Sequence, residues 1–430
     1  MIETREKEER TVLVCYSHKT DIRNSHTEES LEELKFLAKT AGAKIVKTFF
    51  QNISEYDPRY LIGKGKADEI AQYVEENEIP LVIFENELSF TNLRNLEQKI
   101  KCKILDKSNL ILDIFAKNAR TSQAKLQVEL AQLEYLLPRL TRQWTHLSKQ
   151  YGGIGTKGPG ETQIETDRRI IKKRISILKD KLKTIDQQRK TQAFERQNYI
   201  RLSLVGYTNA GKSTLLNLLT NSNVYVEDKL FATLDTSTRT LSLSKLKDEK
   251  ILSRFPKKVL VSDTVGFIKN LPHNLIESFK STLSETIESD ILLHVIDISN
   301  SNFEEQMEVV FQTLKEIGAG NQKVINIFNK IDNLKNRNLL KGIKSRFPEA
   351  VFISAKKGIY INSLLEKIIF DLRAGSIEKT IRLKPADFKN LSVVYKLAEV
   401  YEVKYLKTAI KVKVRANEKN LLQLERVIKC

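Results

Sequence analysis

The chain contains little cysteine, histidine or tryptophan: 3 Cys, 5 His and 1 Trp in 430 residues. Cys15, Cys102 and Cys430 lie far apart, and no C-x-x-C or Cys/His cluster occurs, so neither a disulfide framework nor a zinc site is indicated. No apolar run approaches the roughly 20 residues of a membrane-spanning helix, and the charged first residues lack a signal-peptide core. We therefore expect a cytoplasmic protein without a membrane span; partial membrane association stays open.

The chain has far more basic than acidic residues, with 72 Lys and Arg against 54 Asp and Glu, a net charge of +18. This excess favours a polyanionic partner over a neutral one, although a lysine-rich proteome could also produce it. Residues 139–190 contain 14 basic and 5 acidic residues, a net +9, which is half of the total. The charge is therefore a local patch.

Four short motifs occur in the order typical of GTP-binding switch domains. Each follows an apolar segment that we expect to be a strand, so that all four meet at the carboxyl edge of one parallel sheet. The motifs are Gly206-Tyr207-Thr208-Asn209-Ala210-Gly211-Lys212-Ser213-Thr214, Asp263-Thr264-Val265-Gly266, Asn329-Lys330-Ile331-Asp332 and Ser354-Ala355-Lys356.

The first two motifs have the chemistry of a phosphate and Mg²⁺ site. The sequence 206–214 matches G-x-x-x-x-G-K-[ST], whose backbone amides surround phosphates. We expect Lys212 to reach the β- and γ-phosphates and Ser213 to coordinate Mg²⁺. Asp263 would hold Mg²⁺ through water, and the amide of Gly266 would sense the γ-phosphate.

The last two motifs have the chemistry of a guanine site. The Asp332 carboxylate can accept hydrogen bonds from guanine N1–H and N2–H₂, whereas adenine would leave it without partners. We expect Asn329 and the loop 354–356 to close over the base.

The segment Phe231-Ala232-Thr233 is a candidate switch I, with Thr233 meeting Mg²⁺ in the GTP state. Thr236 or Thr238 could take this place instead. Many GTPases carry a glutamine directly after the Gly266 position, but this chain has Phe267, which cannot orient water. We expect slow intrinsic GTP hydrolysis. The expected catalytic residues within the chain are Lys212, Thr233 and Gly266.

Asn209 is a candidate ligand for K⁺, which would add positive charge beside the β- and γ-phosphates. Asn at this position occurs in several potassium-stimulated GTPases. An ordinary loop Asn that bonds its own backbone explains the residue equally well.

Two heptad stripes indicate an antiparallel helical hairpin across the basic segment. We expect Pro138 to kink or break the first helix, and the Gly-rich segment 151–160 to be non-helical. The functional interpretation is an RNA-binding arm with a narrow tip; the alternative is a solvated coiled-coil spacer. The stripes are Leu126, Leu130, Leu133, Leu137, Leu140, Trp144 and Leu147, then Ile171, Ile175, Leu178, Leu182 and Ile185. The candidate RNA-binding residues are Gly152, Gly153, Gly155, Lys157, Gly158, Gly160, Arg168, Arg169, Lys172 and Lys173.

These patterns predict an α/β protein of four parts: a small parallel α/β domain (1–107), the basic helical hairpin (108–196) with its tip (151–163), a doubly wound P-loop GTPase domain (197–373) and a small α/β domain (374–430). In the first part, strands are expected at 11–16, 44–50, 81–84 and 102–105, and helices at 28–40, 66–78 and 91–100. In the last part, strands are expected at 380–383 and 409–414, and helices at 391–400 and 417–428. The turn 62–66 either binds a phosphate or is a plain turn.

The sequence of the tip, together with the phosphate loop and switch I, resembles the HflX family of translational GTPases. The segment from Gly152 to Glu165, with Gly158-Pro159-Gly160-Glu161-Thr162-Gln163 at its centre, is the distinctive part, and Phe267 also fits this family. The motifs predict the use of GTP, GDP and Mg²⁺, and we expect a monomer. The resemblance implies that the protein binds the large ribosomal subunit and its rRNA and dissociates stalled or idle ribosomes. No DNA specificity is indicated.

Two alternatives stay open. One is a large-subunit assembly GTPase that splits nothing. The other is an RNA-remodelling protein that tolerates ATP and uses GTP as a regulatory switch.

Overall fold

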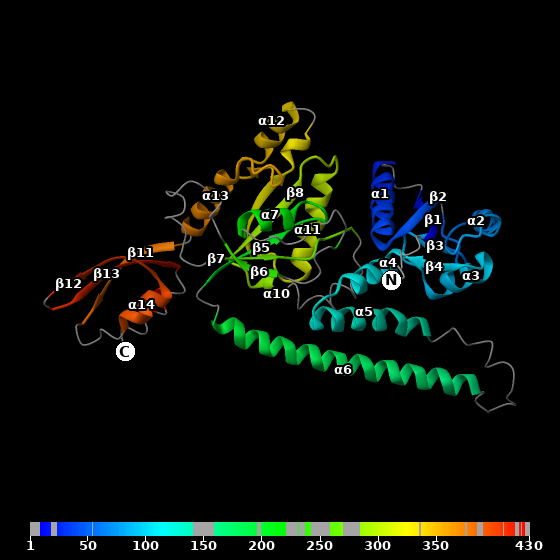
Figure 1. The fold of residues 1–430 in the computed structure, drawn as a ribbon, viewed down its shortest axis with the longest axis horizontal. Coiled ribbons are helices and arrows are strands. Elements are labelled where there is room, and N and C mark those ends of the chain that lie inside the picture. Colours follow the sequence, from blue (N-terminus) through cyan, green and yellow to red (C-terminus); the bar gives the residue numbers. More distant parts are fainter. Residues whose placement is uncertain are drawn as a thin grey trace, which may run out of the picture. The chain divides into compact units, whose positions relative to one another are not determined.

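The chain divides into two compact units (Figure 1). Unit 1 contains Met1–Gln187, Glu227–Asp235 and Ile268–Thr282, and unit 2 contains Gln188–Val226, Thr236–Phe267 and Leu283–Cys430. The computed structural model describes residues 9–18, 24–53, 55–140, 159–195, 199–220, 231, 237–241, 259–269, 284–334, 337–374, 376–384, 390–406, 408–417, 421–422 and 424–425.

Unit 1 begins with a four-stranded parallel sheet in the order β2-β1-β3-β4. Residues of β1 and β3, such as Val12, Val14 and Val82, are buried and form a core with helix residues such as Ile70 and Leu96. The alternating strands and helices agree with the parallel α/β domain predicted from the sequence. The elements are β1 (Glu9–His18), α1 (Asn24–Ala41), β2 (Ala43–Ile53), α2 (Lys64–Glu76), β3 (Leu81–Phe84), α3 (Phe90–Ile100) and β4 (Lys103–Asp106).

The turn before α2 uses its polar groups internally. The amide of Gly63 donates to Oε1 of Gln51 at 3.2 Å, and Lys66 pairs with Glu69. These contacts favour the plain turn over a phosphate site.

Helices α4 (Lys107–Asn118), α5 (Ser122–Leu140) and α6 (Pro159–Glu195) follow. Helices α5 and α6 lie side by side (Figure 1). Leu130 of α5 packs on Leu178 and Leu182 of α6, which is the seam expected from the heptad stripes. The rest of the first stripe, from Trp144 onward, lies outside the described residues.

Two local expectations about this hairpin need correction, and a third is only partly tested. Helix α5 continues two residues past Pro138, so the proline does not break the helix at its own position, and a kink there stays a prediction. Helix α6 begins at Pro159, so Gly160 is helical although the Gly-rich segment 151–160 is expected to exclude helix. Proline is well suited to the first helical position, which explains the early start. Arg139, counted in the basic patch, is buried: its guanidinium lies 3.4 Å from a carboxylate oxygen of Asp106 and stacks on Tyr135.

Unit 2 contains a six-stranded sheet in the order β10-β9-β8-β5-β7-β6, parallel except for β6. Strand β8 is almost completely buried, as expected for a central strand covered on both faces. The strands are β5 (Ile200–Val205), β6 (Ser237–Thr240), β7 (Val259–Asp263), β8 (Ile291–Asp297), β9 (Lys323–Asn329) and β10 (Val351–Phe352). The helices are α7 (Lys212–Thr220), α10 (Ser284–Ile287), α11 (Phe303–Glu316), the short 3₁₀ helix η1 (Ile331–Asn333), α12 (Arg337–Arg346) and α13 (Ile361–Ala374).

The last part of the chain forms a three-stranded antiparallel sheet in the order β11-β13-β12 with its own apolar core. Its elements are β11 (Ser376–Leu383), α14 (Leu391–Leu397), β12 (Glu399–Tyr405) and β13 (Ile410–Asn417). The expected helix 391–400 thus ends at Leu397, and strand β12 was not predicted. The expected helix 417–428 falls mostly outside the described residues; 421–422 and 424–425 are helical.

None of the helices that the structure describes is both long and apolar enough to cross a membrane.

Candidate GTP-binding site

The loop between β5 and α7 has the backbone conformation that a phosphate loop requires. Gly206 and Gly211 have φ values of 149° and 96°, which are open to glycine but strained for other residues. A Cβ on Gly211 would also collide with the side chain of Asn329. Asn209 is exposed with φ of 59°, a conformation that Asn tolerates better than most residues. The sequence therefore fixes this loop at three positions.

Lys212, the first residue of α7, is buried under the loop. Its ammonium group donates to the carbonyl oxygens of Gly206 and Tyr207 at 3.0 and 2.7 Å. Burial lowers the pKa of Lys212 to about 8, against an opposing effect of Asp263. An anion beside this ammonium group would stabilise its charged form, as expected for a phosphate-binding lysine.

Two oxygen donors suited to Mg²⁺ lie side by side next to Lys212. The hydroxyl of Ser213 donates to Oδ2 of Asp263 at 2.7 Å. Asp263 is fully buried at the end of β7, and the neighbouring Thr264 hydroxyl donates to the Leu204 carbonyl oxygen, which anchors the strand end. Hydroxyl and carboxylate oxygens are the ligands Mg²⁺ prefers, so these residues fit the ion.

The start of switch II is joined to the phosphate loop. The amide of Phe267 donates to the Gly206 carbonyl at 3.1 Å, and its carbonyl accepts from the Thr208 amide at 2.8 Å. A Cβ on Gly266 would lie 2.7 Å from Cγ2 of Thr208 and 3.0 Å from Nζ of Lys212. Position 266 therefore requires glycine. Phe267 is buried, so it contributes packing rather than contact with solvent.

Asn329 joins two of the motifs. Its side-chain nitrogen donates to the Ala210 carbonyl, and its side-chain oxygen accepts from the Ala355 amide, both at 2.9 Å. The residue is buried. Asn329 therefore holds the phosphate loop and the loop 354–356 in register; that it also closes over the base stays a prediction.

Asp332, the predicted guanine-binding residue, lies in η1. A hydrogen bond from Ser354 holds its pKa below the usual value, so its carboxylate is ionised and able to accept from a base. Lys330 has a left-handed backbone and pairs with Asp297 at 2.7 Å. Asp297 was not predicted as part of the site. It ends the central strand β8 and lies in register with Asn329 of β9, so its position directly after an apolar strand could have indicated it.

The remaining predicted nucleotide contacts occupy the same loops. Their exposure is as follows: Tyr207, Thr208 and Ala210 are buried, Thr214 and Val265 are half-buried, Ser354 and Ala355 are buried, and Lys356 is exposed.

The switch I candidates are only partly described. Ala232, Thr233 and Thr236 lie outside the described residues. Thr238 belongs to β6, where its hydroxyl bonds to Ser262 and Glu285, so it is committed to the sheet. Phe231 belongs to unit 1, where its ring packs edge-on against Phe115.

On helix α6 of the candidate RNA-binding arm, the predicted basic residues are separated from the buried leucines of the seam. Arg168, Arg169, Lys172 and Lys173 are exposed on α6. The rest of the tip set, Gly152, Gly153, Gly155, Lys157 and Gly158, lies outside the described residues, and Gly160 is described only as part of the first turn of α6.

Three family profiles match consecutive stretches of the chain. Residues 28–116 match the GTP-binding GTPase N-terminal region, 118–196 match the GTP-binding GTPase middle region, and 201–330 match the 50S ribosome-binding GTPase family. Together they span most of the chain.

Curated relatives agree with these profiles. The chain is 51% identical to the GTPase HflX of Flavobacterium psychrophilum over 72% of each chain, and 40% identical to that of Escherichia coli over 86% of each. A solved GDP complex of a protein called SsGBP is similar at 26% identity and a TM-score of 0.48, covering 84% of this chain and 97% of that one. The sequence relationship and the GTP-binding motifs show that the chain belongs to the HflX family of ribosome-associated GTPases and is a GTP hydrolase.

Proposed function

We propose that this protein binds the large ribosomal subunit through its basic hairpin and uses GTP binding and hydrolysis to dissociate stalled or idle ribosomes. The observation that carries the proposal is the segregation of α6 into two faces. Leu178 and Leu182 pack on α5, while Arg168, Arg169, Lys172 and Lys173 are exposed. A row of exposed cations beside a rigid seam suits the phosphates of structured rRNA.

Within the nucleotide site, each residue has a distinct task. Lys212 would bind the β- and γ-phosphates, and Asp332 would select guanine. Ser213 and Asp263, together with Thr233 in the GTP state, would hold Mg²⁺, which neutralises developing phosphate charge. The Gly266 amide would report the γ-phosphate, and its loss on hydrolysis would release the switches.

The buried Phe267 supports slow intrinsic hydrolysis, because nothing at this position can orient water. We propose that the ribosome completes the site. A potassium ion held by Asn209 is the second proposal: this residue is exposed at the loop apex. Equal turnover in KCl and NaCl would overturn the potassium proposal.

The first experiment measures GTP turnover with and without purified large subunits, and ribosome dissociation by light scattering. Large-subunit stimulation of turnover, together with GTP-dependent splitting, is expected. A variant with Gln at Arg168, Arg169, Lys172 and Lys173 should lose both. A control with Gln at the exposed residues Lys39, Lys315, Lys341 and Lys344 should keep both.

Other outcomes identify the alternatives. Stimulation without splitting indicates a large-subunit assembly GTPase. Strong ATP turnover that survives Lys212→Ala indicates an RNA-remodelling protein with a regulatory GTP site. We further propose that the protein acts as a monomer in the cytoplasm.

A further inference from the structure

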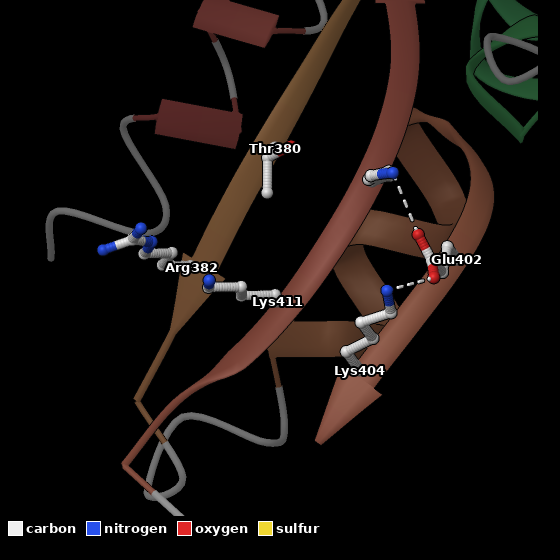
Figure 2. A pocket seen from close by; sticks show the side chains of 6 residues that line it. Thr380, Arg382, Glu402, Lys404 and Lys411 are labelled. Carbon is white, nitrogen blue, oxygen red and sulfur yellow. Dashed lines mark ion pairs between the residues drawn. The ribbon is translucent and has the colours of Figure 1, made fainter. Parts of the chain in front are cut away.

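The C-terminal sheet has one covered face and one open face. Side chains that alternate along the strands, such as Leu383, Val412 and Val414, are buried in the core that includes α14 residues. The side chains between them point the other way. They line a depression of about 670 Å³ formed by Thr380, Arg382, Glu402, Lys404, Lys411 and Lys413 (Figure 2).

Strand register places three cations in one row across this open face. Arg382 of β11 lies opposite Lys411 of β13, and Lys411 lies opposite Lys404 of β12. We call these residues the cationic row. Neighbouring strands are about 4.8 Å apart, so the row spans about 10 Å. All three side chains reach the depression, and Arg382 and Lys404 are exposed.

The acids on this face neutralise only the Lys404 end of the row. Glu402 is paired with Lys404 at 2.8 Å and with Lys413 at 3.1 Å, and these two lysines hold its pKa low (Figure 2). Glu378 pairs with Arg415, and this pair lies four residues along the strands from the Arg382–Lys411 pair. Among the described residues no carboxylate pairs with Arg382 or Lys411.

Without a bound anion, the cationic row destabilises the sheet. Like charges directly opposite each other on adjacent strands repel and destabilise the pairing. Of the three aligned cations only Lys404 has a carboxylate partner, and it shares Glu402 with Lys413 outside the row. The row therefore carries an electrostatic cost, which an external anion would remove. The segment 374–430 contains 13 basic and 6 acidic residues, a net +7, so the surroundings add to the attraction.

We propose that the open face of the β11-β13-β12 sheet binds the phosphate backbone of RNA through Arg382, Lys411 and Lys404. A sheet face with cations at regular spacing suits a chain of regularly spaced phosphates. The planar guanidinium of Arg382 adds donors in a fixed arrangement, and the hydroxyl of Thr380 adds a rotatable donor for phosphate oxygens. This surface is separate from the arm on α6 and does not depend on ribosome dissociation.

A substitution of Glu402 should change RNA affinity in the opposite direction from substitutions in the cationic row. The carboxylate occupies two of the lysines that a phosphate would contact. Glu402→Gln therefore frees Lys404 and Lys413 and removes one repulsive charge. This variant should bind RNA more tightly, whereas neutralising the cationic row should weaken binding.

The experiment measures binding of the full-length protein to a fluorescent 20-nucleotide single-stranded RNA over a range of KCl concentrations. The triple variant Arg382→Gln, Lys404→Gln, Lys411→Gln should bind about tenfold more weakly, and its slope of log affinity against log salt should fall by about 2, since each phosphate contact contributes about 0.7. A control with Gln at Lys315, Lys341 and Lys344, also exposed, should match the wild type.

Two further readouts separate binding from folding. Removing the repulsion should leave the Tm of the triple variant unchanged or slightly raised, so weaker binding would not reflect misfolding. RNA containing 4-thiouridine should crosslink to peptides from 376–417 in the wild type and not in the triple variant. Wild-type affinity and salt slope in the triple variant, or an absence of crosslinks in this region, would overturn the proposal.

Discussion

The side-chain nitrogen of Asn118 donates a hydrogen bond to the carbonyl oxygen of Phe231, with 2.9 Å between the two atoms. Asn118 is the last residue of α4, and Phe231 precedes the switch I candidate Thr233 by two residues. Phe231 is buried and has φ of 56°, a strained value for a bulky residue. The contact therefore holds a strained residue two positions before the switch I candidate Thr233.

Asn118→Ala should loosen the backbone around Phe231. The Phe231 carbonyl would lose its donor, at a cost of about 1 kcal/mol, and amide hydrogen exchange around residue 231 should become faster. Asn95→Ala is a matched control, because Asn95 donates to the Arg59 carbonyl at 3.0 Å. Exchange around residue 231 that is equally fast in both variants would show that the effect is general rather than local.

The ring contact between Phe115 and Phe231 should be measurable as a coupling energy. Their centroids are 4.7 Å apart with planes at 84°, the edge-to-face arrangement that aromatic pairs favour. A double-mutant cycle with Phe115→Leu and Phe231→Leu, read by urea unfolding, should give a coupling of about 1 kcal/mol. The same cycle between Phe49→Leu and Phe231→Leu should be additive, because Phe49 packs with Tyr73 instead.

The sequence was informative wherever chemistry demands particular residue types. The phosphate loop, Asp263, Asp332 and the strands before them follow from local patterns, because each motif must end a buried strand. The pairing of Arg139 with Asp106 was not predictable, since it depends on residues 33 positions apart. The role of Asn329 was likewise missed, because both of its partners are backbone atoms of distant loops.

The errors at the C-terminal end have a different cause. Strand β12 carries the alternation Val400, Val403 and Tyr405 interrupted at Tyr401 by a register shift, which hides its period of two. The preceding helical residues then extended the predicted helix into the strand. The cationic row could not be predicted from the sequence either, because it depends on how three strands are paired in register.

Gly266→Ala should abolish nucleotide-dependent switching. The added Cβ would lie 2.7 Å from Cγ2 of Thr208 and 3.0 Å from Nζ of Lys212, so the phosphate loop or switch II must shift. GTP turnover should fall at least about tenfold, because displacing the Lys212 ammonium weakens transition-state contacts worth more than about 1.4 kcal/mol. Gly65→Ala, where a Cβ meets nothing within 4 Å, should keep wild-type turnover.

Asp332→Asn should weaken GTP binding and favour a purine that carries a carbonyl instead of an amino group at position 2. The amide that replaces the carboxylate keeps one oxygen, which can still accept from guanine N1–H, but its NH₂ group would face the guanine N2–H₂ donor, so one of the two contacts becomes repulsive. Xanthosine triphosphate, which presents a carbonyl at position 2, should bind the variant better than GTP in a competition assay. The Lys357 partner of Asp332 lies at 3.6 Å and serves as a control: Lys357→Ala should retain the preference for guanine.

The buried ammonium of Lys212 should make the nucleotide-free protein more stable as the pH rises. Burial lowers the folded-state pKa to about 8 from 10.5, so between these values the unfolded chain binds more protons than the folded one. The free energy of unfolding therefore increases through this range, by an amount on the order of 3 kcal/mol. Urea unfolding at pH 7.5 and pH 10 measures the increase.

The buried thiols change the free energy of unfolding with pH in the opposite direction. The measurement therefore compares the wild type with a variant that lacks only the lysine. Burial raises the pKa of Cys15 to about 12 and of Cys102 to about 11, so their stabilisation declines as the pH passes 9. The difference between the wild type and Lys212→Met isolates the lysine, because both proteins carry the same thiols. That difference should change with pH in the nucleotide-free protein and flatten with saturating GDP, since a bound phosphate raises the pKa of the ammonium group again. A difference that is constant from pH 7.5 to pH 10 without nucleotide would show that Lys212 keeps an ordinary pKa in the folded protein.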